Sequence, residues 1–140
     1  MSAITATRTA PTSSVPSVGA LLRDGAGATV LAAVATAAVA AAGQAVGISL
    51  DISAAPIPVS GFATLTVMFS VIGLLIAVGL RRFARRPRTT WIRTTVALTV
   101  VSLVPDVLVD AAATTKVLLM VTHLVAAAIV IPAVARRLHA

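Results

Sequence analysis

The chain has 140 residues, of which 59% are hydrophobic and 11% are charged, and its mean hydropathy is +1.05. A soluble domain of this length does not normally carry so apolar a surface, so the composition predicts an integral membrane protein. The sequence contains no cysteine, which excludes disulfides, thiolate catalysis and cysteine-based metal sites.

The positive charge of the chain is concentrated in one segment. The formal net charge is +7, and six of the eleven basic residues fall within residues 81–93. A nucleic-acid-binding patch is one interpretation of such a cluster. Because the cluster lies between two apolar segments, a cytoplasmic loop that meets anionic lipid headgroups is the simpler interpretation, and we expect no nucleic-acid partner. The cluster consists of Arg81, Arg82, Arg85, Arg86, Arg88 and Arg93.

Residues 1–22 are predicted to form a disordered cytoplasmic tail, because Ser, Thr, Ala and Pro cannot bury enough apolar surface to become ordered. Their composition also resembles a transit peptide. Residues 23–140 are predicted to form the transmembrane domain, and its first span covers about residues 26–48. The alanines at 40–42 also permit a cleaved signal peptide, which would leave the downstream topology unchanged.

Small residues follow one face of each of the first two predicted spans, and such faces let helices approach closely. The second span covers about residues 61–80 and contains no charge. Residues 49–60 carry two prolines and are predicted to form an extended loop between the spans. The small residues are Thr29, Ala33, Thr36, Ala40, Gly43 and Gly47 in the first span, and Thr66, Ser70, Gly73 and Ala77 in the second.

The third predicted span, about residues 92–113, combines an apolar face with a polar stripe and follows Trp91, a predicted interfacial anchor. Pro105 predicts a kink, because it lacks an N–H and crowds the carbonyl of Val101. Charged groups inside a membrane are expensive and usually face the bundle interior. The stripe consists of Thr95, Thr99, Ser102, Asp106 and Asp110, spaced 4, 3, 4 and 4 positions apart.

The fourth span is predicted over about residues 116–135 and holds His123 and Pro132. A connection of only a few residues predicts that the third and fourth spans run antiparallel and pack together. The distribution of Arg and Lys places both termini and the Arg-rich loop in the cytoplasm by the positive-inside rule. The sequence therefore predicts an all-α, multi-pass bundle of four transmembrane helices in the bacterial plasma membrane.

Helix rise places Asp106 and His123 at the same depth in the outer half of the membrane. A proton relay is one hypothesis for this pair, because His titrates near neutrality. The other is a structural pair that fixes the register of the hairpin, with Asp110 and Lys116 as a partly wet ion pair. The candidate polar cluster consists of Asp106, Asp110, His123, Gln44 and Ser102.

No enzyme signature accompanies this cluster. The sequence contains two histidines, and His139 is predicted in the cytoplasmic tail, far from His123, so a metal site is not favoured. His123 could serve as a haem ligand, but no other feature supports haem. The sequence has no Gly-x-Ser-x-Gly motif and no P-loop. We therefore predict no catalytic residues, no metal and no cofactor.

Two stretches carry a resemblance to a family of small four-helix membrane proteins from high-GC Gram-positive bacteria, a domain of unknown function. They are SLVPD at residues 102–106 and MVTHLVAAAIVIPAVARRL at residues 120–138, in which His123 and Pro132 are the most telling positions. The resemblance covers about residues 26–138. It implies a four-helix membrane fold and no particular activity, substrate or partner.

Two functional hypotheses follow from these patterns. The first is a non-enzymatic membrane component that acts through helix packing, either as a homo-oligomer or with a membrane-protein partner, and the small-residue faces motivate it. The alternative is a small proton-coupled transporter, or a subunit of one, that uses an Asp/His relay in the third and fourth helices. Four short helices without an evident inverted repeat or broken span favour the first hypothesis.

Overall fold

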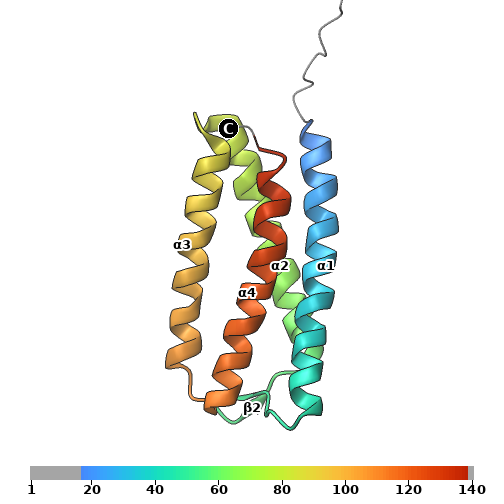
Figure 1. The fold of residues 1–140 in the computed structure, drawn as a ribbon, viewed down its shortest axis with the longest axis vertical. Helices are drawn as coiled ribbons and strands as arrows, with labels where there is room; N and C mark the ends of the chain where they lie inside the picture. Colours follow the sequence, from blue (N-terminus) through green and yellow to red (C-terminus); the bar gives the residue numbers. More distant parts are fainter. Residues whose placement is uncertain (1–16, 139–140) are drawn as a thin grey trace, which may run out of the picture.

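The computed structural model describes residues 17–138, which form four long α-helices (Figure 1). Each helix is long and apolar enough to cross a membrane, so the predicted all-α fold with four membrane-length helices is confirmed for this part of the chain. Residues 1–16 of the predicted tail and His139 lie outside the described residues. The helices are α1 (Val18–Ala45), α2 (Val59–Phe83), α3 (Pro87–Leu108) and α4 (Ala113–Ala135).

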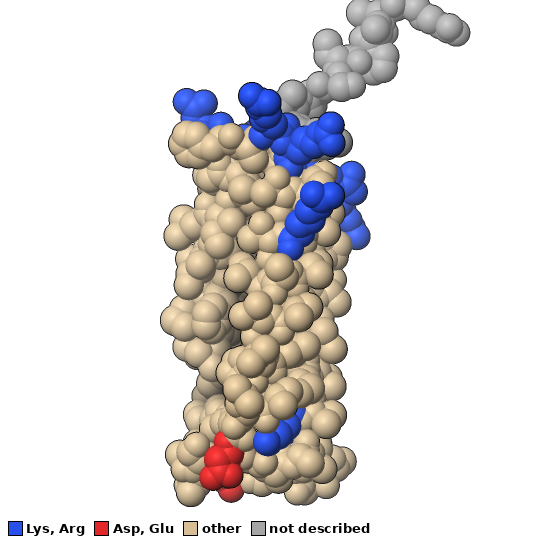
Figure 2. All heavy atoms as spheres, turned by 90° about the vertical axis from the view of Figure 1, so that its left-hand side faces the viewer, with Lys and Arg blue, Asp and Glu red and all other residues tan. Residues whose placement is uncertain are grey.

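Helices that are consecutive in the chain run antiparallel, and both described ends of the chain lie at the same end of the bundle as the α2–α3 connection (Figure 1). We call this the arginine end, because Arg side chains gather there, whereas few charged side chains show on the long surface below them (Figure 2). Helix α1 packs against α2 and α4, whereas α3 packs mainly against α4.

The helix boundaries differ from the predicted spans where local hydrogen bonds set them. Helix α1 begins at Val18, before the predicted span, because the Ser17 hydroxyl accepts a hydrogen bond from the backbone N–H of Ala20 at 3.1 Å and caps the helix. Helix α3 begins at Pro87, which suits a first helical position because its missing N–H needs no partner there. It ends at Leu108 rather than at Ala113, and Val109 is already extended.

The predicted extended loop between the first two helices is instead a short β-hairpin of β1 (Asp51–Ile52) and β2 (Ala55–Pro56). Ser53 and Ala54 form its turn with φ of 51° and 63°, the left-handed conformation that a two-residue hairpin turn requires. The backbone N–H of Ser53 donates to the carbonyl of Asp110 at 2.8 Å. The hairpin therefore closes the bundle at the end opposite to the arginines.

The small-residue face of α1 is used inside the chain. A Cβ atom at Gly25 would come within 2.2 Å of the Leu74 side chain on α2, and one at Gly43 within 2.8 Å of Leu118 on α4. Between these points the hydroxyls of Thr36 and Thr66 lie 3.0 Å apart and share a hydrogen bond. Glycine thus lets α1 touch both neighbours where a larger residue would hold them apart.

Candidate functional site

Asp106 and His123 come together between α3 and α4. The Asp106 carboxylate oxygen Oδ2 lies 2.7 Å from Nδ1 of His123, so the predicted proximity of these two groups is confirmed. The Asp106 side chain is only 9% exposed, whereas the His123 side chain is 40% exposed. The acid is therefore buried behind the imidazole ring.

The contact between the two groups is close but poorly aligned. Oδ2 of Asp106 is fully buried and has no hydrogen bond of good angle within residues 17–138, in spite of the 2.7 Å separation. Nδ1 of His123 also lies 3.1 Å from the carbonyl oxygen of Leu119, one turn earlier in α4. We regard the pair as an electrostatic contact, because the N–O distance is short but the geometry is not that of a hydrogen bond.

Asp110 and Lys116 do not form the predicted ion pair, which is a correction. Lys116 Nζ instead donates to the carbonyl of Val107 at 2.9 Å. Helix α3 ends early, so Asp110 lies exposed in the connection, while the last carbonyls of α3 lack helical partners. These carbonyls are the negative end of the helix dipole and attract the ammonium group.

Gln44 stays apart from the Asp106–His123 pair, because it is exposed at the end of α1. Ser102 lies on α3 one turn before Asp106 and donates to the carbonyl of Thr99 at 2.7 Å. Within the described residues no three His, Asp or Glu side chains come together as a metal site. Of the predicted cluster, only Asp106 and His123 are in direct side-chain contact among the interactions that the structure describes.

The hydroxyl groups of the α3 stripe are bound to their own helix. Thr95 donates to the carbonyl of Trp91 at 2.7 Å, and Thr99 donates to that of Thr95 at 2.8 Å. Such bonds to the preceding turn satisfy a hydroxyl without any neighbouring helix. The stripe can therefore face an apolar space without unpaired donors.

A pocket of about 500 Å³ lies beside this stripe, between α2, α3 and α4. His123 is the one titratable side chain that lines it among the described residues. Trp91 lines it near the arginine end, where its indole N–H donates to the carbonyl of Ile131 at 3.1 Å. The other residues that the argument below uses are Phe62, Phe69, Thr66, Thr122 and Ala126.

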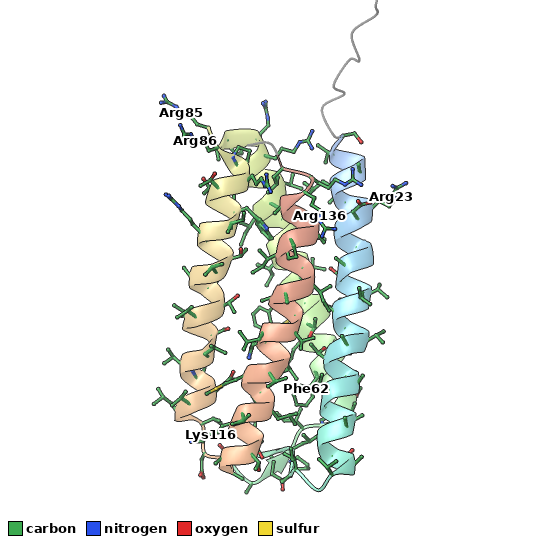
Figure 3. The ribbon with its side chains drawn as sticks, in the orientation of Figure 1. Arg23, Phe62, Arg85, Arg86, Lys116 and Arg136 are labelled. Atoms are coloured by element: carbon green, nitrogen blue, oxygen red, sulfur yellow. The ribbon has the colours of Figure 1, made fainter. Side chains whose placement is uncertain are left out.

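Trp91 and the phenylalanines were not among the predicted site residues. Trp91 is 1% exposed and belongs to the core at the arginine end, so the prediction of an interfacial anchor is wrong. Phe62, seen between α4 and α1 in Figure 3, belongs to the core at the opposite end. One signal was available in the sequence, because the chain has only four aromatic residues.

Most side chains of the Arg-rich cluster are exposed rather than packed in the bundle. Arg85 and Arg86 point away from the helices at the α2–α3 connection (Figure 3). Five members of the cluster are exposed, whereas Nη1 of Arg81 is buried and has no hydrogen-bond partner within residues 17–138. Exposed guanidinium groups suit anionic groups such as phosphate.

A second pocket of about 710 Å³ lies between α1 and α4 at the arginine end. Asp24 lines it and accepts a hydrogen bond from Arg137 Nε at 2.7 Å. Asp24 lies in the charged turn that precedes the apolar run of α1, and the hydrogen bond from Arg137 lowers the pKa of its carboxyl group. This ion pair fastens the start of α1 to the end of α4.

Comparison with curated proteins and with solved structures gives no significant match. The sequence profile of a family does match residues 16–140, which include all four helices and both members of the Asp106–His123 pair. The family is described as a family of unknown function, DUF6069. Because the match covers nearly the whole chain, the chain belongs to this family.

Proposed function

We propose that this protein is a non-enzymatic component of the bacterial plasma membrane whose four helices span the bilayer, with both termini in the cytoplasm. The segregation of charge supports this orientation, because the arginines gather at one end of the bundle and Lys116 lies at the other (Figure 3). Positive loops stay on the cytoplasmic side of a membrane. The exposed guanidinium groups would then meet anionic lipid headgroups.

The absence of cysteine makes this topology directly testable. In intact cells, a membrane-impermeant maleimide should label Ala54→Cys in the hairpin turn but not Ala84→Cys in the α2–α3 connection. Permeabilised cells should label both variants. Labelling of Ala84→Cys alone in intact cells would reverse the orientation.

We propose further that the protein acts by binding an apolar molecule of the lipid phase in the pocket between α2, α3 and α4. The observation that carries this function is the pocket itself, which is mostly apolar and has one ionisable group, His123, at its wall. Pockets of a few hundred Å³ with few polar groups are typical ligand sites. The buried Asp106 behind His123 would hold the ring in place.

The hypothesis of association through small-residue faces has less support. Gly43, a member of the predicted small-residue face, already faces Leu118 of the same chain, and Gly25, one turn before that face, meets Leu74. Any self-association or partner helix would have to use the outward faces of the bundle, which carry large apolar side chains suited to lipid. We therefore place ligand binding before helix association.

Photolabelling with a medium-chain alcohol that carries a diazirine group tests the pocket. We expect saturable labelling of pocket-lining residues in the wild type and its loss in Ala126→Leu, which fills the pocket. Ala97→Leu is the matched control, because Ala97 is exposed on α3 and does not line the pocket. Labelling that rises in proportion to probe concentration, and equally in both variants, would contradict the proposal.

A proton relay is a second candidate function, and the 2.7 Å contact between Asp106 and His123 favours it. Proton flux into liposomes that contain the protein, driven by an imposed membrane potential, tests it. The relay predicts flux in the wild type that Asp106→Asn abolishes and Asp110→Asn preserves, since Asp110 lies exposed in the connection. A flux equal to that of empty liposomes would reject the relay and leave the ligand-binding proposal unaffected.

A further inference from the structure

We propose that the pocket between α2, α3 and α4 binds a lipid-soluble quinone, and that His123 donates a hydrogen bond to one of the quinone's ring carbonyls. This inference rests on the proposed function, because it names the chemical class of the molecule that the pocket takes. Three observations support it: the aromatic residues of the pocket, the pocket hydroxyl groups that already donate to carbonyls of their own helices, and the atoms that surround the His123 ring.

The aromatic residues of the chain are concentrated in this pocket. The sequence has three Phe and one Trp, and Phe62, Phe69 and Trp91 all line the pocket. Phe69 is 63% exposed on α2, so its ring is not packed in the core. Aromatic side chains pack favourably against other planar rings in offset or edge-to-face arrangements. Because Phe62 and Trp91 are packed into the cores at the two ends of the bundle, Phe69 is the pocket side chain that can stack on a flat ligand ring.

The hydroxyl groups of the pocket offer little hydrogen-bond donation to a ligand. Five of its six Ser and Thr side chains, all except Thr94, donate to carbonyls of their own helices. A hydroxyl has one proton to donate, so these groups retain only acceptor capacity. The donors left to a ligand are His123 and, close to Trp91 on α3, Thr94, because the Trp91 indole N–H is bound to the Ile131 carbonyl.

The contact with Asp106 determines what His123 presents to the pocket. When the pair shares two protons it is net neutral, either as a carboxylate beside an imidazolium or as a carboxylic acid beside a neutral imidazole. A net neutral pair has a lower free energy than a net charged pair in a medium of low dielectric constant. In the first arrangement Nδ1 donates to the Leu119 carbonyl while it faces the carboxylate, so Nε2 also carries a hydrogen. The Leu119 carbonyl beside Nδ1 favours the first arrangement.

A flat apolar molecule with a hydrogen-bond acceptor on its ring matches this site. A quinone has carbonyl oxygens of this kind, whereas the ester carbonyls of membrane lipids are attached to flexible chains rather than rings. The ring would lie beside His123, and the pocket continues along α4 to Trp91. Ile131, whose carbonyl binds Trp91, lies about 12 Å beyond His123 by the helical rise.

Trp91 is the single tryptophan of the chain and reports on the pocket that it lines. We would titrate the full-length protein in lipid nanodiscs with a benzoquinone that carries one isoprenoid unit, and follow quenching of Trp91 emission. We expect saturable quenching that Ala126→Leu abolishes and Ala97→Leu preserves. Removing one hydrogen bond in His123→Leu should weaken the apparent affinity about two- to tenfold. His123→Gln keeps an N–H donor and should recover part of that loss.

A competition experiment on the wild type avoids any dependence on how the His123 variants fold. The competitor is an aromatic hydrocarbon of the same size and with the same chain, but without a carbonyl. The concentration of the hydrocarbon that displaces half of the bound quinone should be at least twofold higher than the concentration of unlabelled quinone that does so. Equal competition, unchanged affinity in His123→Leu, or quenching that never saturates would each overturn the quinone assignment. If the quinone assignment fails but the diazirine alcohol still labels the pocket saturably, the proposed ligand-binding function remains supported. If the alcohol does not label the pocket saturably, both proposals are overturned.

Discussion

Helices α1 and α3 both carry a stripe of small and hydroxyl residues, yet the bundle uses the two stripes differently. On α1 the residues Gly25, Thr36 and Gly43 are buried against α2 and α4. On α3 the residues Thr95, Thr99 and Ser102 remain half-buried beside a pocket. Glycine opposite leucine produces close contact, whereas the α3 hydroxyls bond only to their own helix among the described contacts and need no neighbouring helix. A stripe of hydroxyls can therefore border a space that a stripe of glycines would close.

Helix α3 is held mainly at its two ends. Its buried residues are Pro87 and Trp91 near the start and Asp106 near the end. The middle of the helix presents its stripe to the pocket on one side and large apolar residues outward on the other. This arrangement leaves room for a ligand while the ends keep the helix in register.

The largest effect is expected from Trp91→Ala, which removes the attachment of α3 at the arginine end. Deleting a buried Trp side chain costs about 3–5 kcal/mol of unfolding free energy through lost contacts and a cavity. Trp91→Phe keeps most of the ring and loses the hydrogen bond to Ile131, worth about 1 kcal/mol. Unfolding by sodium dodecyl sulfate, followed by circular dichroism, measures both. Equal losses in the two variants would mean that the hydrogen bond to Ile131, and not the packing of the indole ring, anchors α3.

The close contacts of α1 predict a smaller loss for Gly25→Ala. The new Cβ would meet the Leu74 side chain, which has to move, and overpacking of this kind costs about 1–3 kcal/mol. Gly27→Ala is the matched control two residues away, because a Cβ there meets nothing within 4 Å. It should stabilise the protein by about 0.5–1 kcal/mol through helix propensity. The same unfolding assay would contradict close α1 packing if both variants were stabilised alike.

Asp106→Asn tests the attachment of α3 at its other end. The variant keeps the size of the side chain but removes the acidic group beside His123, and we expect a loss of about 0.5–3 kcal/mol, the usual range for a substitution that breaks a buried polar contact. Asp110→Asn, an exposed position in the connection, should stay within about 0.5 kcal/mol of the wild type. A comparable loss in both would remove the distinction between the buried and the exposed acid.

The number of helices and the meeting of Asp106 with His123 could be predicted from the sequence, because they depend on hydropathy and helical rise over many residues. The exact ends of the helices could not. Helix α3 ends at Leu108 because Val109 turns extended and the Lys116 ammonium binds the carbonyl of Val107. Such contacts depend on atoms from two segments, so apolar length alone cannot locate them.

The pocket between α2, α3 and α4 could not be predicted from sequence patterns either. The spacing of Thr95, Thr99 and Ser102 indicates a polar face but does not say whether a helix covers it. Trp91 lies within the Arg-rich cluster, where an interfacial anchor would be expected, and yet its indole N–H donates to the carbonyl of Ile131 inside the bundle. The hairpin turn at Ser53 and Ala54 lacks the Gly or Asn that usually marks a left-handed turn.

The smallest predicted effect compares one hydroxyl from each stripe. Thr36→Val removes a hydroxyl that bonds across helices to Thr66, and such bonds between membrane helices are worth about 0.6 kcal/mol on average. Thr99→Val removes a hydroxyl that bonds only to its own helix among the contacts described, so we expect a change close to zero. Valine has nearly the same shape as threonine, so neither variant leaves a cavity.

Unfolding of both threonine variants in the same detergent gives the comparison. A loss in Thr99→Val as large as in Thr36→Val would mean that Thr99 has a hydrogen-bond partner outside its own helix. Because Thr99 lines the pocket, that partner would be a molecule retained there during purification. Repeating the measurement in Ala126→Leu, which fills the pocket, would then return the Thr99→Val effect to zero, whereas the Thr36→Val effect would stay the same.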